Sequence, residues 1–168
     1  MLKPAQLHAE ELTRKFLEVA YNEDYMFYNS GWTSKYEPSE GTWNMHEFVS
    51  IYNGKVIGYI SYDINQRSQN VTNIRIINFS NNKYAFILDI IKVVHDIFYK
   101  YKYNKISFGA YVGSPAEKMY DKFIKKYGGK IVGIHEMESK LLDGRFYDFK
   151  SYEILNKYSN IYQIRKGI

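Results

Sequence analysis

Two hairpin turns, one near the middle of the chain and one near its end, constrain the fold more than any other feature. Asn53-Gly54 and Asp143-Gly144 each stand between two runs of β-branched and aromatic residues. Asn, Asp and Gly tolerate the positive φ angles of a two-residue hairpin turn, so both dipeptides predict antiparallel strand pairs. The four strands joined by these turns are predicted at 46–52, 55–63, 131–142 and 145–155.

The stretch between the two hairpins alternates strand with helix. The β-rich run VTNIRIINF at 71–79 precedes a segment at 84–101 whose apolar residues form a wide stripe at helical spacing. The run KISFGAYV at 105–112 follows, and a second helix begins at Pro115. A strand–helix–strand unit implies a crossover between parallel strands. We therefore predict an α/β (α+β) fold with a mixed, mostly antiparallel central sheet flanked by helices on both faces.

The second helix carries its own start and stop signals. Ser114 is expected to cap the backbone N–H of Glu117, whose side chain reaches back toward the N-terminus of the helix. Pro115 occupies the first helical position, where no N–H is needed. Gly128-Gly129 supplies the left-handed conformation that ends many helices.

The N-terminal third is predicted to be helical and then irregular. Apolar residues recur at helical spacing over about 4–20, and a second short helix is predicted at 23–28. Residues 29–43 are rich in Gly, Pro and Ser and predict a loop. Since no linker or repeat divides the chain, we predict one domain over residues 1–168. Its parts are N-terminal helices and loop at 1–43, a core at 44–155 and a tail at 156–168.

Composition excludes several classes of site. The 168 residues include no cysteine, which excludes disulfides, zinc–thiolate sites and a cysteine nucleophile and fits a reducing compartment. No apolar run is long enough for a signal peptide or a membrane span, so we expect a cytoplasmic protein with no membrane partner. No two histidines with a carboxylate have metal-ligand spacing, and we predict no metal. The net charge of +5 suits nucleic acid, a phosphate-rich ligand or no particular partner.

In the order of its elements the chain resembles the GNAT superfamily of acyl-CoA-dependent N-acyltransferases. The resemblance covers roughly residues 44–155 and rests also on the hairpin FVSIYNGKVIGYISYDI and the stretch SPAEKMYDKFIKKYGGKIVG. The second stretch looks like the penultimate helix of the family and the glycines that follow it. The resemblance implies a GNAT-like fold and transfer of an acetyl group from acetyl-CoA to an amine of a small molecule or peptide.

The resemblance also implies where acetyl-CoA would bind. In the family the fourth strand is bulged and splays from the fifth, the pantetheine arm lies in the gap, and the N-terminus of the next helix faces the pyrophosphate. Here the strand would be 71–79 and the helix would start near Tyr84. Asn82, Ala85 and Ile87 stand where the family usually has Arg or Gln, Gly, and Gly or Ala. The implied cofactor-binding residues are Ile77, Phe79, Asn82, Lys83, Tyr84, Ala85 and Phe86.

Transfer from a thioester to an amine requires a group that protonates the leaving thiolate. In the family this role often falls to a Tyr on the helix after the fifth strand, and the resemblance places it at Tyr120. Tyr120 also shares a helical face with Ala116, Phe123 and Tyr127, so packing in the core is the alternative interpretation.

The sequence does not single out a general base. Some family members place a Glu on the fourth strand, but 71–79 contains no carboxylate. Glu47 and Asp63 on the neighbouring hairpin are candidates by position, and three histidines are candidates by pKa. The histidines are His46, His95 and His135.

Aromatic residues gather in and before the 29–43 loop, on the side that covers the acceptor cleft in the GNAT family. Tyr28, Trp32 and Tyr36 are predicted to bind the acceptor, and the alternative is that they seal an edge of the sheet.

Two other functions remain open. The unusual 82–87 loop and the missing strand carboxylate also suit a catalytically degenerate GNAT-like domain that binds acyl-CoA or acts as a scaffold. The net charge and the abundant tyrosine also suit a basic nucleic-acid-binding module, although the chain has no nucleic-acid motif. The edge of the final hairpin and the tail leave a homodimer open.

Overall fold

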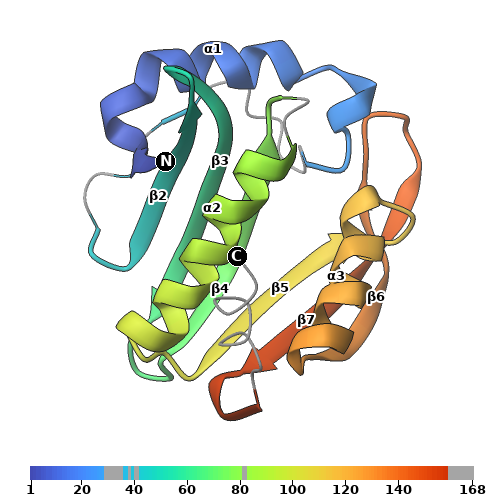
Figure 1. Ribbon diagram of the computed structural model, residues 1–168. Helices are drawn as coiled ribbons and strands as arrows, with labels where there is room; N and C mark the ends of the chain where they lie inside the picture. Colours follow the sequence, from blue (N-terminus) through green and yellow to red (C-terminus); the bar gives the residue numbers. More distant parts are fainter. Residues whose placement is uncertain (29–35, 38, 40–41, 81–82, 159–168) are drawn as a thin grey trace.

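The computed structural model describes residues 1–28, 36–37, 39, 42–80 and 83–158 and contains a seven-stranded mixed sheet (Figure 1). The strands are Leu2–Pro4 (β1), Met45–Tyr52 (β2), Lys55–Asn65 (β3), Asn70–Asn78 (β4), Lys105–Tyr111 (β5), Lys130–Lys140 (β6) and Phe146–Leu155 (β7). They lie in the order β1-β2-β3-β4-β5-β7-β6, and only β4 and β5 are parallel. The predicted mixed, mostly antiparallel sheet is confirmed.

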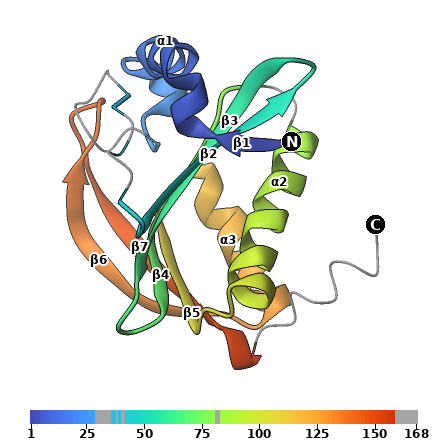
Figure 2. The same ribbon diagram turned by 90° about the vertical axis from the view of Figure 1, so that its left-hand side faces the viewer.

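Three α-helices of the described residues pack on this sheet. They are Ala9–Val19 (α1), Lys83–His95 (α2) and Pro115–Tyr127 (α3), accompanied by short helical turns at Ala5–His8 (η1), Glu23–Tyr25 (η2), Asp96–Lys100 (η3) and Asn156–Tyr158 (η4). Figure 2 shows α2 and α3 on one face of the sheet and α1 on the other.

The two covered faces give two apolar clusters with different helices. Leu12 of α1 packs with Val49 and Tyr59, whereas Phe86 of α2 packs with Ile60 on the opposite face. Successive residues of β3 therefore enter different clusters, because side chains alternate across a strand. Both faces of β3 are covered, so its residues 56–62 are all buried. This explains why the strand reads as a nearly continuous apolar run.

The first predicted turn is confirmed, whereas the second hairpin forms with a longer connection than predicted. Asn53 and Gly54 have φ angles of 50° and 75°, as the two-residue hairpin turn requires. The second hairpin instead has a five-residue connection, 141–145, in which Gly144 has the positive φ, 77°. The Asp143 carboxylate accepts hydrogen bonds from the backbone N–H of Arg145 (3.0 Å) and from the Tyr147 hydroxyl (2.8 Å), which closes this wider loop.

Two elements differ from the sequence-based prediction. The helix predicted from residue 4 is preceded by β1, which pairs with β2 along Leu2↔Ser50 to Pro4↔Phe48. A three-residue strand has too few residues to show a period of two, so the pattern could not reveal it. The helix predicted at 84–101 divides into α2 and the π-helical turn η3, where Tyr101 N–H donates to the Asp96 carbonyl.

The caps of α3 agree with its sequence signals. The Glu117 N–H donates to Ser114 Oγ (3.2 Å), and the Glu117 carboxylate accepts from the Gly113 N–H (2.8 Å). Gly128 ends the helix with a φ of 87°, and its N–H donates to the Ile124 carbonyl. No helix among the described residues is long and apolar enough to cross a membrane.

Close packing between β3 and α2 predicts that one added methyl group lowers the free energy of unfolding. A Cβ at Gly58 would lie 2.3 Å from the ring of Phe86, whose side chain is 2% exposed. We expect Gly58→Ala to lower the free energy of unfolding by about 1–3 kcal/mol, because the buried ring has to leave its position. Urea unfolding of the purified variant measures this change.

The matched control is Gly133→Ala on β6, since a Cβ there meets no atom within 4 Å. Its free energy of unfolding should stay within about 0.5 kcal/mol of the wild type. Adding Phe86→Leu to Gly58→Ala should recover part of the loss. Equal unfolding midpoints for Gly58→Ala and Gly133→Ala would contradict the close contact.

Candidate active site

The site begins where β4 and β5 separate. These strands pair only at Asn70↔Lys105 and Val71↔Ile106. Beyond these pairs β5 continues along β7, and the edge of β4 that faces β5 has no further ladder partner among the described residues. Its backbone N–H and C=O groups are left open to a ligand or to water.

A β-bulge in β4 accompanies this separation. Asp63 pairs with Thr72 and Ser61 pairs with Arg75, so two residues of β4 oppose the single residue Tyr62. Asn73, in the bulge, has a φ of 52°, and its side-chain amide donates to the Asp63 carboxylate (2.7 Å). A bulge bends its strand and increases the local twist, which directs β4 away from β5.

Two cavities meet at the gap. The open-face cavity, of about 530 Å³, lies on the face that carries α1 and is lined by polar side chains such as Thr72, Ser107 and Ser151. The helix-side cavity, of about 310 Å³, lies between α2 and α3. Four of the described residues line both cavities and therefore lie between them. They are Ile74, Ile76, Phe108 and Tyr120.

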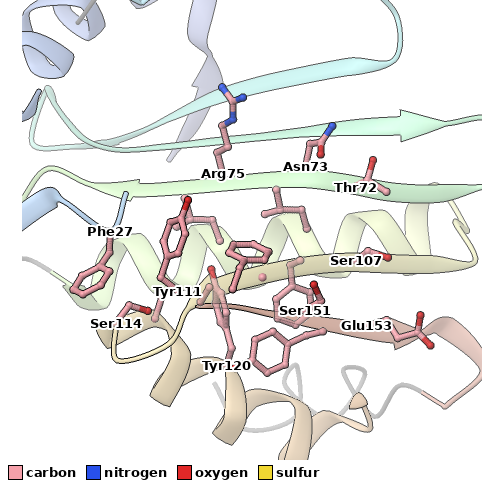
Figure 3. A pocket seen from close by; sticks show the side chains of 18 of the residues that line it. Phe27, Thr72, Asn73, Arg75, Ser107, Tyr111, Ser114, Tyr120, Ser151 and Glu153 are labelled. Carbon is pink, nitrogen blue, oxygen red and sulfur yellow. The ribbon is translucent and has the colours of Figure 1, made fainter. Parts of the chain in front are cut away.

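Tyr120 projects from α3 into the space between the two cavities (Figure 3). Its ring packs edge-on against Phe108 and Tyr152, with centroids 5.0 and 5.9 Å away. Its hydroxyl has no hydrogen-bond partner in the described part of the chain, and burial raises the pKa of Tyr120. At neutral pH the hydroxyl therefore keeps its proton and is available to donate to a ligand in the gap.

A polar network fixes the rings around Tyr120. The Tyr152 hydroxyl donates to the Asp121 carboxylate (2.9 Å), and Lys150 Nζ donates to Asp121 (2.9 Å) and to Glu117 (3.2 Å). Tyr152 stacks on Phe108 with ring centroids 5.4 Å apart. The network joins α3 to β7 and holds the two rings against which Tyr120 packs.

The helix-side cavity is almost entirely apolar. Isoleucines of β4, β5 and α2 line it together with Met119 and Phe123 of α3. Lys122 and Lys126, both exposed, are the charged residues of the described chain that line it. Such a lining suits an apolar arm whose charged end lies at the rim.

The residues predicted to bind the cofactor lie around the start of α2 and the end of β4, but several of their side chains face elsewhere. Ile77 is buried in the α1-side cluster, and Phe79 packs there against Phe16 (5.8 Å). Phe86 is buried against Gly58, so its side chain cannot line the helix-side cavity. Phe79 and Phe86 line neither cavity and can offer only backbone groups to a ligand there, whereas Ile77 also lines the open-face cavity.

The other predicted cofactor residues lie at the first turn of α2. Lys83 begins the helix, Tyr84 is 71% exposed, and Ala85 packs against the large cluster. Asn82 lies outside the described residues. Ile87, which stands where the GNAT family usually has Gly or Ala, lines the helix-side cavity.

Of the three predicted acceptor residues, one lies at a cavity. Tyr28 lines the open-face cavity, and burial raises its pKa. Tyr36 is instead a core residue of the α1-side cluster, stacked on Phe16 (5.8 Å) and 6% exposed. Trp32 lies outside the described residues. Aromatic composition predicted the cluster but not which rings face the cavity.

The candidate bases lie away from the gap. Glu47 is 4% exposed and accepts hydrogen bonds from the Tyr59 hydroxyl (2.6 Å) and the Ser39 N–H (2.9 Å), within the α1-side cluster. Asp63 is bound by Asn73. None of His46, His95 and His135 lines either cavity among the described residues.

Sequence reasoning missed the charged residues of the open-face cavity. They are Arg75 of β4, Lys105 of β5 and Glu153 of β7. A period of two along each strand would have placed each of them on one face, but not on the same face as the others. No group of three His, Cys, Asp or Glu side chains among the described residues could hold a metal ion.

Comparisons with solved structures identify this arrangement. An N-acetyltransferase from Staphylococcus aureus is similar with a TM-score of 0.71 at 14% identity, over 93% of this chain and 98% of the other. A structure described as a probable acetyltransferase of the GNAT family, from Chromobacterium violaceum, has a TM-score of 0.69 at 15% identity, over 94% of this chain and 87% of the other. This is the GNAT fold. The GNAT fold is also shared by a mutant spermidine N-acetyltransferase from Vibrio cholerae, with a TM-score of 0.69 at 20% identity, over 95% and 96%.

No family model and no curated protein sequence matches the chain. At identities of 13–21% the structural likeness defines the GNAT fold and leaves the activity to the residues of the site.

The network beneath Tyr120 predicts a pH dependence. The hydrogen bond from Lys150, and secondarily the one from Tyr152, lowers the pKa of Asp121 in the folded protein. The ionised Asp121 carboxylate stabilises the folded protein fully above the pKa of about 3.9 that it has in the unfolded chain. This stabilisation is lost as the pH falls through its lower pKa in the folded protein. Asp121→Asn should therefore be less stable than the wild type at pH 7, and the difference should shrink near pH 3.

Urea midpoints at the two pH values measure this effect. The control is Asp24→Asn, an exposed carboxylate of η2 outside this network, whose midpoint should follow the wild type at both pH values. A difference for Asp121→Asn that is the same at pH 7 and pH 3 would mean that the network does not depend on the charge of this carboxylate.

Proposed function

We propose that this protein is an N-acyltransferase that moves an acetyl group from acetyl-CoA to an amine of a small molecule or peptide. The observation that carries the proposal is the position of Tyr120, which holds a protonated hydroxyl between the apolar helix-side cavity and the open-face cavity. A thioester arriving from one face and an amine arriving from the other would meet beside this hydroxyl.

The helix-side cavity fits the apolar, amide-bearing arm of coenzyme A. The open backbone edge of β4, beyond Val71, can hydrogen-bond its amides as an added strand does. The backbone N–H groups at the start of α2, near Tyr84, can face its pyrophosphate. Lys122 and Lys126 at the rim supply positive charge. This charge offsets the absence, in the 82–87 loop, of the Arg or Gln and the Gly that the family usually has there.

The proposed chemistry assigns one step to Tyr120. The amine nitrogen attacks the thioester carbon, a C–N bond forms and the C–S bond breaks. The Tyr120 hydroxyl donates its proton to the departing sulfur and is reprotonated by solvent. The amine loses its proton to water, because Glu153, the carboxylate that lines the open-face cavity among the described residues, already binds Lys105 (3.2 Å) and Lys130 (3.0 Å).

The first test is Tyr120→Phe. We expect kcat to fall by roughly 10²-fold or more, since proton donation by a positioned side chain contributes about 10²–10⁴-fold. The dissociation constant for CoA, measured by isothermal calorimetry, should stay within about twofold of the wild type because the ring and its packing are kept. The release of CoA thiol in an amine screen gives the rate.

Tyr127→Phe is the matched control, since Tyr127 lies on the same helix and lines only the helix-side cavity. Its kcat should match the wild type. An unchanged kcat in Tyr120→Phe would remove Tyr120 from the mechanism.

A second test addresses the binding of CoA. The double charge reversal Lys122→Glu with Lys126→Glu should raise the dissociation constant for CoA at least about tenfold, a loss of about 1.4 kcal/mol. Calorimetry at low and high salt should show that the loss shrinks as salt screens the phosphates.

Lys118→Glu with Lys125→Glu changes the net charge equally, on exposed positions of α3 that line neither cavity. This control should bind CoA as the wild type does. Equal losses in the two double variants would show that only the overall charge matters and that no phosphate lies at this rim.

A second candidate function is a GNAT-like domain that binds acyl-CoA without turnover. The Ile87 side chain at the helix-side cavity, where the family has a small residue, favours it. CoA binding without thiol release for any amine would support this candidate. The single domain, the cytoplasmic location, a homodimer and a nucleic-acid-binding role stay predictions.

A further inference from the structure

The charged groups of the open-face cavity differ in how they are paired. Glu153 is 14% exposed and binds both Lys105 and Lys130, so this carboxylate is already matched. Arg75 lines the same cavity, is exposed, and has no ion pair or hydrogen bond among the described residues. The cavity therefore offers an unpaired cation and no unpaired carboxylate in the described part of the chain.

The bulge explains why Arg75 is unpaired. Arg75 follows the bulge and lies opposite Ser61 on β3. Asp63, the carboxylate two residues further along β3, accepts instead from the Asn73 amide (2.7 Å). Figure 3 shows Arg75 on β4 at one side of the gap and Tyr120 on α3 at the other.

The unpaired guanidinium of Arg75 selects the molecules that bind in the open-face cavity by their charge. Its planar donors bind a carboxylate or a phosphate in a bidentate manner, and it repels a second cation. A polyamine would require unpaired carboxylates along its length. The spermidine N-acetyltransferase from Vibrio cholerae shares the fold with this chain. The charges of the open-face cavity nevertheless favour an acceptor of another class than a polyamine.

We propose that the acceptor is an amine that also carries an anionic group, a carboxylate or a phosphate, and that Arg75 binds this group while the amine lies at the gap beside Tyr120. The proposal rests on the proposed acyl transfer. The aromatic rings of Tyr28, Tyr111 and Phe149 line the same cavity and would enclose the carbon chain between the two ends. The net charge of +5 favours the approach of such an anionic molecule.

The experiment compares amines in pairs that differ in the anionic group. γ-Aminobutyrate is paired with γ-aminobutyramide, O-phosphoethanolamine is paired with ethanolamine, and spermidine represents the polyamines. Released CoA is detected with a thiol reagent, which gives no background from a chain without cysteine. In the wild type, kcat/KM for at least one anionic member should exceed that of its neutral partner at least about tenfold, or about 1.4 kcal/mol. The pair with the larger difference identifies carboxylate or phosphate.

The variant that tests the residue is Arg75→Ala. It should raise KM for the anionic member at least about tenfold and leave the neutral member within about twofold, because one charge-assisted pair is lost. Arg75→Lys should recover part of the preference. Arg67→Ala, in the turn before β4 and away from the cavity, is the control and should behave as the wild type.

The outcomes separate this inference from the proposed function. Turnover that is best with spermidine, or an anionic preference that survives in Arg75→Ala, would leave acyl transfer in place and overturn the inference. If no amine leads to thiol release, calorimetric titration of γ-aminobutyrate and O-phosphoethanolamine in the presence of CoA tests the anionic site without turnover. Binding that Arg75→Ala removes would support the anionic site although the catalytic proposal fails, and no binding of either compound would overturn the inference.

Discussion

The hydrogen-bond ladder between β4 and β5 ends after two residue pairs, and the rest of the site depends on this early end. Each strand keeps a long ladder on its other side, β4 with β3 and β5 with β7, so the sheet stays intact while its middle opens. One large apolar cluster bridges the opening, since Ile60 and Val71 on one side pack with Ile106 and Tyr152 on the other. Burial of these side chains offsets the unpaired backbone at the gap.

The two faces of the open sheet differ in chemistry because different elements cover them. α2 and α3 shield one face with apolar residues. On the other face α1 covers β2, β3 and the end of β4, which leaves polar side chains such as Ser107 and Ser151 accessible. Among the described residues, those that line the cavities of both faces lie at this gap. Tyr120 occupies it because Phe108 and Tyr152 hold its ring there, and Tyr152 is in turn held by Asp121 and Lys150.

Sequence patterns predicted the turns and caps of the fold better than the residues that line the site. The Asn53-Gly54 turn and the Ser114 cap are local, and their φ angles and hydrogen bonds agree with the residues that predicted them. Tyr120 was placed by resemblance, while its helical spacing equally suited the core; the structure gives it both a packed ring and a free hydroxyl. Tyr36 and Phe86 could not be separated from cavity-lining aromatics by composition, because only the packing of α1 and α2 buries them.

The sequence by itself determined the order of strands and helices after β1, the turn at Asn53-Gly54 and the caps of α3, because each rests on backbone preferences of a few neighbouring residues. Tertiary structure alone decided where β4 leaves β5, which rings line the cavities, and that Glu153 is paired while Arg75 is free. These features join residues of different strands and helices. A pattern along one segment carries no information about the segment that packs beside it, so only the folded sheet brings Arg75 and Tyr120 to the same gap.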